Sequence, residues 1–177
     1  KFPPAGFTLH WYAAYFSDPD WLAATFFSIR IAALTAIVAT IVGTLISLAL
    51  VRGRLPGKPA FELLVVGPVI VPNIALAIAT FLVFDGLRLT GTTLGFVAAH
   101  TALAMPFVVF TILASLYRFD ADLERAALSC GASPLRAFFW VTLPQIMPGI
   151  VSAALFAFII SFDEPVISFF ISDLDHR

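Results

Sequence analysis

The sequence has 177 residues, of which 60% are hydrophobic and 12% are charged, and its formal net charge is −1. Soluble domains typically contain about half apolar and a quarter charged residues, and a soluble chain of ~180 residues buries only ~70% of the surface it could expose. The composition therefore excludes a soluble enzyme, a disordered tail and a nucleic-acid-binding protein. It predicts a protein whose surface largely faces lipid.

Four apolar segments are long enough to cross a bilayer, which requires about 20 apolar residues. They cover residues 21–50, 61–84, 92–117 and 146–171. Each is expected to be helical, because lipid offers no water to an unsatisfied backbone. The sequence thus predicts an all-α, polytopic membrane bundle in which residues 1–177 form a single transmembrane domain.

The basic residues concentrate in two of the links between these spans. Residues 52–58 contain three of the ten Lys and Arg residues, and residues 118–145 contain another three. Because cytoplasmic loops carry an excess of Lys and Arg, both links are expected in the cytoplasm. The chain ends and residues 85–91 are then expected on the outer side.

Pro68, Pro72 and Pro106 fall inside the second and third predicted spans. Proline lacks the N–H that continues a helix and favours a kink. These prolines are either hinges for a change in access across the membrane or static kinks, which membrane helices tolerate.

Residues 118–145 form the longest polar link and indicate two short helices joined by a turn. Asp120 can cap the first helix and Ser133 the second, and Gly131 falls where a helix end needs a positive φ. Leu143–Pro144 are expected to end the second helix. Because the link also carries a Phe-Phe-Trp run, it is expected to dock on its own membrane domain or on a partner.

The spacing in this link resembles the EAA loop of ABC importer permeases, in which EAA, three residues, Gly, nine residues, Ile, one residue and Leu-Pro follow one another. Ala126-Ala127, Gly131, Val141 and Leu143-Pro144 meet that spacing, and Arg125 replaces the usual glutamate. The resemblance implies that residues 118–145 are the coupling helix that enters a cleft on an ATP-binding subunit. The ATPase-coupling residues are then Asp120, Glu124, Arg125, Ala126, Ala127, Gly131, Val141, Leu143 and Pro144.

Other segments resemble the spermidine/putrescine-type permeases. They are His100 with Ala104 and residues 106–109 in the third span, and residues 161–170 in the fourth. The resemblance implies the type I, methionine-permease-like fold of ABC importers. About four full spans are expected in this chain, with the outer helices of the usual six missing.

Asp163 and Glu164 are the only adjacent acids inside a predicted span. An ionised residue at that depth usually faces protein or a water-filled cavity, so the pair is a candidate for a cation-attracting part of the substrate path. Alternatively, the acids lie near the outer headgroups or cap a broken helix. His100 is the third candidate, although a lone histidine in a membrane helix is more often a hydrogen-bonded helix contact. With no second histidine nearby, no metal site is predicted.

The resemblance implies the permease subunit of a bacterial ABC importer, multi-pass in the inner (plasma) membrane, with a polyamine as its solute. It implies no enzymatic activity, no cofactor and no nucleic acid. The expected partners are ABC ATP-binding subunits, a second permease subunit of the same or a different kind, an extracytoplasmic substrate-binding protein and membrane lipid. Three alternatives stay open: an importer for iron, thiamine, an opine or an amino-acid-like solute, a channel without an ATPase, and a membrane enzyme.

Overall fold

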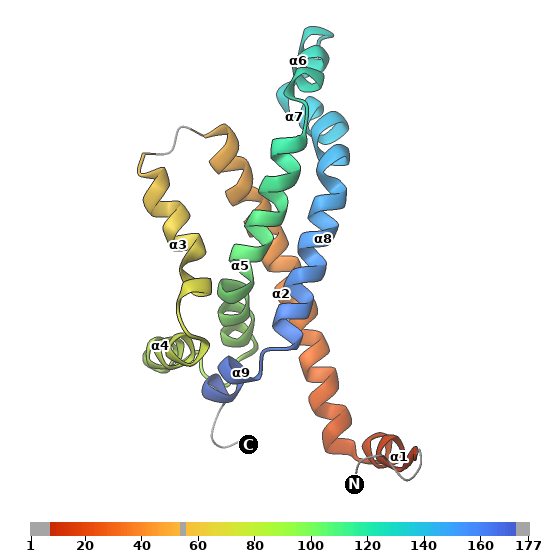
Figure 1. Ribbon diagram of the computed structural model, residues 1–177, viewed down its shortest axis with the longest axis vertical. Helices are drawn as coiled ribbons and strands as arrows, with labels where there is room; N and C mark the ends of the chain where they lie inside the picture. The colour runs from red at the N-terminus through yellow and green to blue at the C-terminus, as the bar shows by residue number, and fades with distance from the viewer. Residues whose placement is uncertain (1–7, 54–55, 173–177) are drawn as a thin grey trace, which may run out of the picture.

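The computed structural model describes residues 8–53 and 56–172, and in these residues the predicted all-α architecture is confirmed (Figure 1). The chain ends, which the charge pattern places on the outer side, lie outside the described residues. In chain order the helices are α1 (His10–Ser17), α2 (Pro19–Arg52), α3 (Lys58–Ile70), α4 (Asn73–Gly86), α5 (Thr93–Arg118), α6 (Ala121–Ser129), α7 (Pro134–Ala137), the π-helix η1 (Phe138–Thr142), α8 (Leu143–Phe162) and α9 (Pro165–Ile171).

The three long helices α2, α5 and α8 pack on one another and form the centre of the bundle. Small residues lie buried where these helices meet, and they let the helix backbones approach closely, as in other membrane bundles. They include Ala39 and Gly43 on α2, Ala104 on α5, and Ala153 and Ala157 on α8. Helix α3 packs against α5, and α4 packs against α9.

The predicted span 61–84 is not one straight helix. Helix α3 ends at Ile70, α4 begins at Asn73, and the two are bent by 111° at the break. Pro72 explains the break, because it lacks an N–H and forces the preceding residue out of the helical region; Val71 is accordingly extended, with φ −80° and ψ 133°. Pro106, in contrast, lies inside the unbroken helix α5.

The boundaries of the predicted span 146–171 also differ from the structure. The helix starts earlier, since α7, η1 and α8 run without a break from Pro134, and it ends at Phe162 instead of Ile171. Three helical segments of the described residues are long and apolar enough to cross a membrane, or up to four if the bent α3–α4 pair counts as one span. The three are Pro19–Arg52, Thr93–Arg118 and Pro134–Phe162.

The two ends of the bundle carry different elements (Figure 1). Helix α6 projects at one end, where the last turn of α2 also lies, and an ion pair between Arg52 and Glu124 joins them. Helices α1, α4 and α9 lie at the opposite end. The C-terminal ends of α2 and α5, which lead into the two basic links, therefore lie on the same side of the bundle, as the charge pattern predicts.

Candidate functional site

The first half of the link 118–145 folds as the sequence predicts. The Asp120 carboxylate accepts a hydrogen bond of 2.9 Å from the backbone N–H of Asp122 and caps α6. Beyond the end of α6, Gly131 has a φ of +89°, a value that suits glycine because it has no Cβ. The N–H of Ala132 donates to the carbonyl of Ala127 across this turn. The turn therefore reverses the chain directly after the Ala126-Ala127 pair.

The second half of the link corrects the prediction that Leu143–Pro144 end a helix. Ser133 caps α7 as expected, by accepting from the N–H of Arg136 at 3.4 Å. The chain then passes through η1, where the N–H of Leu143 donates to the carbonyl of Phe138, five residues earlier. This wider π turn accommodates Pro144, which has no N–H to donate, so the helix continues into α8.

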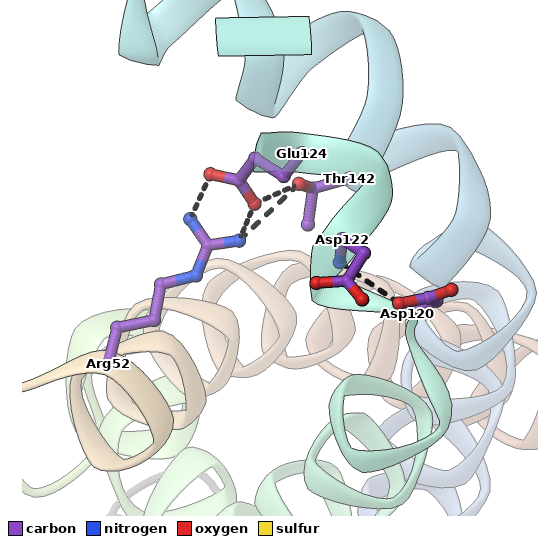
Figure 2. A network of polar contacts seen from close by, with 5 residues as sticks. All are labelled: Arg52, Asp120, Asp122, Glu124 and Thr142. Atoms are coloured by element: carbon purple, nitrogen blue, oxygen red, sulfur yellow. Dashed lines mark hydrogen bonds and ion pairs between the residues drawn. The ribbon is translucent and has the colours of Figure 1, made fainter. Parts of the chain in front are cut away.

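Glu124 points inward and joins three elements (Figure 2). Its Oε1 accepts from Arg52 Nη1 at 3.1 Å, and its Oε2 accepts from Arg52 Nη2 and, at 2.6 Å, from the Thr142 hydroxyl. The Glu124 side chain is only 17% exposed, and the Arg52 guanidinium also lies 5.8 Å from the centre of the Phe138 ring. Bidentate pairs of this kind are strong and directional.

Arg52 and Thr142 are members of this site that the sequence patterns did not predict. The sequence does relate both residues to the link. Arg52 lies in a basic link that is predicted on the same side as residues 118–145, and Thr142 lies at the variable position between Val141 and Leu143. Neither signal predicts a contact between α2 and α6, because nothing in the sequence says which links meet.

The outward face of the link is exposed and mixes charge with apolar side chains. Arg125 pairs with Asp122 on its own helix at 3.0 Å, and both side chains are about three-quarters exposed. Trp140 is 80% exposed, and Leu135 and Phe139 also lie on the surface. The remaining predicted coupling residues surround this face: Ala126 and Pro144 are exposed, while Ala127, Val141 and Leu143 are half-buried. The link is thus built as a projecting body with an unpartnered apolar surface.

A second candidate site lies at the opposite end of the bundle, where α8 gives way to α9. Asp163 and Glu164 form this break and border a cavity of about 380 Å³ together with Asn73, which begins α4. The other lining residues are apolar and come from α3, α5 and α8: Pro68, Val69, Leu103, Phe107, Ile159 and Ile160. An acidic cavity with mostly apolar walls suits a small organic cation.

The two acids in this cavity have different environments. Asp163 is exposed, whereas Glu164 is 8% exposed. Glu164 Oε1 accepts from the N–H groups of Val166 and Ile167 and caps α9, and Oε2 accepts from Asn73 Nδ2 at 3.1 Å. Glu164 therefore ties α9 to α4, and Asp163 presents its carboxylate to the surface.

His100 lies near this break but does not line the cavity. Its ring is buried, with Nδ1 2.8 Å from the Ser161 hydroxyl and Nε2 3.0 Å from the Ser168 hydroxyl. Ser161 belongs to α8 and Ser168 to α9, so His100 bridges the two sides of the break from α5. The structure therefore brings all three predicted path residues to one end of the bundle.

Comparison with known proteins is consistent with this architecture. The model of the family described as "Binding-protein-dependent transport system inner membrane component" matches residues 52–173, and the chain belongs to this family. It is 34% identical over 178 residues to the putrescine transport system permease protein PotI of Escherichia coli K12, covering 95% of this chain and 62% of PotI. It is also 34% identical over 175 residues to the spermidine/putrescine transport system permease protein PotC of Haemophilus influenzae, covering 97% of this chain and 67% of PotC.

A more distant relative is the trehalose transport system permease protein SugB of Mycobacterium tuberculosis, which is 29% identical over 167 residues, covering 93% of this chain and 60% of SugB. The chain thus spans about three-fifths to two-thirds of the length of these relatives. By family and fold the chain is a multi-pass inner membrane component of a binding-protein-dependent transport system, and the relatives are named as transport permeases.

Proposed function

We propose that this chain forms one half of the membrane path of a binding-protein-dependent ABC importer for polyamines. Partner ATP-binding subunits dock on residues 118–145, and a second permease subunit completes the path. A binding protein delivers the solute to the outer end, where Asp163 and Glu164 attract the cation and His100 holds the wall of the path.

The observation that carries this proposal is the projecting helix–turn–helix of α6, α7 and η1. Leu135, Phe139 and Trp140 in this segment expose more than half of their surface. Large apolar side chains exposed in a short polar link favour an interaction site. A channel that works without an ATPase has no need of such a body. A membrane enzyme would need a cluster of reactive groups, whereas Glu164 is held as a helix cap, His100 is held between two serines and Asp163 is exposed.

The solute is tested with the intact permease, its ATP-binding subunits and its binding protein in liposomes. We expect the binding protein loaded with spermidine or putrescine to stimulate ATP hydrolysis at least about fivefold over the unloaded protein, in the range of typical allosteric coupling. The same protein incubated with trehalose, an amino acid or Fe³⁺ is the control. Stimulation by one of these solutes in place of a polyamine would refute the polyamine assignment and leave the importer class standing.

The charge of Arg125 gives a test of docking. The usual acid of the signature is replaced by a cation here, so we propose that the partner ATPase carries an acid facing Arg125. Arg125→Glu is expected to weaken ATPase stimulation about fivefold, because like charges across an interface oppose docking. Arg125→Gln should lie between this variant and the wild type. Improved coupling in Arg125→Glu would contradict the proposed acid on the partner.

A further inference from the structure

The contact between α6 and the rest of the bundle is sparse apart from one cluster. A hollow of about 350 Å³ lies beneath α6, between it and the ends of α2 and α5, and is lined in part by Val51, Leu116 and Phe119. Arg52 crosses from α2 to Glu124 on α6 at this hollow. Among the described residues, the polar contacts between α2 and α6 are those of this pair.

Thr142 makes the cluster a three-way connection. Its hydroxyl donates to Glu124 at 2.6 Å and lies 3.3 Å from Arg52 Nη2, from which it accepts. Thr142 is buried and is the last residue of η1, directly before α8. Arg52, Glu124 and Thr142 are here called the clasp. They join the end of α2, the first turn of α6 and the end of η1, directly before α8 (Figure 2).

Both helices that leave the clasp lead toward the opposite end of the bundle. Helix α8 continues from Leu143 to Phe162, which is ~30 Å at ~1.5 Å per residue, and the next residue is Asp163. Helix α2 runs beside it through the centre of the bundle. Because a helix moves largely as a rigid rod, a displacement of the clasp reaches the acidic cavity.

We propose that Arg52 is a positioning residue, and that the clasp transmits movement of the coupling loop to α2 and α8 together. The inference rests on the proposed function. The Glu124 carboxylate thus faces the rest of the bundle and holds the loop in place, while the neighbouring Arg125 side chain is 74% exposed and accessible to the partner. Removing one partner of a half-buried ion pair leaves the other uncompensated, so each single variant should release α6 from α2.

The first test measures how firmly α6 is held and needs neither solute nor partner subunits. Spin labels are placed on Cys130, which is exposed at the end of α6, and on Val51→Cys at the end of α2, in the permease in lipid nanodiscs. We expect a narrow distance distribution that broadens in Glu124→Gln and Arg52→Gln. The matched control is Glu62→Gln, which breaks the Lys58–Glu62 pair within α3 and should leave the distribution unchanged.

The second test measures solute moved per ATP hydrolysed in the assembled importer, with radiolabelled spermidine as the probe. We expect Glu124→Gln and Arg52→Gln to lower this ratio at least about fivefold, with the ATP-binding subunits still co-purifying. The exchange Arg52→Glu with Glu124→Arg should restore both the ratio and the narrow distances. Thr142→Val should lower the ratio less than either charge variant.

The outcomes separate the clasp from the proposed function. Wild-type label distances together with a wild-type ratio of solute to ATP in both charge variants would overturn the clasp. Loss of the ATP-binding subunits from Glu124→Gln would also overturn it, because Glu124 would then act at the docking surface. A wild-type complex without stimulated ATP hydrolysis would overturn the proposed function, while the label distances would still decide whether the clasp holds α6 on α2.

Discussion

Replacing Gly149 with alanine is expected to destabilise the permease by about 1–3 kcal/mol, the usual cost of overpacking. Gly149 lies where α8 crosses α5, and an added Cβ would collide with the side chain of Ser115, including its Cβ at 2.6 Å. Because the Ser115 Cβ is fixed to the backbone of α5, one of the two helices must shift. The free energy of unfolding in mixed micelles, followed by tryptophan fluorescence, measures this change.

A second substitution tests whether that collision is the cause. Ser115→Gly removes both clashing atoms, and the next neighbour of the added Cβ is the Thr111 carbonyl oxygen at 3.7 Å, an ordinary contact. The pair Gly149→Ala with Ser115→Gly should therefore recover most of the lost stability. Gly67→Ala in α3 is the control, because nothing lies within 4 Å of its added Cβ; it should stabilise by up to ~1 kcal/mol through helix propensity. Equal loss of stability in both alanine variants would contradict the packing argument.

Neutralising Asp163 is expected to lower polyamine transport about tenfold or more without changing the fold. The carboxylate is exposed at the mouth of the acidic cavity, and a hydrogen bond to a charged group is worth about 1.5–3 kcal/mol. Asp163→Asn keeps the shape of the side chain and removes only its charge. Uptake of radiolabelled spermidine at a concentration below saturation measures the effect.

Two further variants show whether this effect belongs to the site. Asp85→Asn removes an exposed acid from α4, near the same end of the bundle but outside the cavity lining, and should leave uptake close to that of the wild type. Glu164→Gln should also destabilise α9, because its carboxylate accepts from two N–H groups and from Asn73. Unchanged uptake in Asp163→Asn would remove Asp163 from the substrate path.

Local signals predicted most of the local fold of residues 118–145. Asp120 and Ser133 cap their helices, and Gly131 takes the left-handed conformation, because each of these features depends on residues within a few positions in the chain. The prediction was wrong at Leu143–Pro144, where a π turn absorbs the proline. A local pattern treats proline as the end of a helix and does not contain the change from α to π hydrogen bonding that lets this helix continue.

The breaks in two of the predicted spans are also features that local sequence patterns do not predict. Hydropathy predicted apolar segments over 61–84 and 146–171, but hydropathy averages over about 20 residues and is insensitive to a break of two. Pro72 marked one break, although Pro106 lies in an unbroken helix, so proline does not by itself decide the outcome. At Asp163–Glu164 the sequence leaves open a capped, broken helix, and in the structure Glu164 is that cap.

The sequence by itself determined that this is an all-α membrane protein, predicted that its two basic links lie on the same side, and indicated which link resembles the EAA loop. Composition, charge bias and capping residues are enough for these features, because each reflects the solvent or the neighbouring backbone. Only the tertiary structure decided that Glu124 bonds Arg52 and Thr142, that His100 bridges α8 and α9, and that Asp163 borders a cavity with Asn73. These contacts join residues 18 to 91 positions apart, and their geometry follows from how the helices pack.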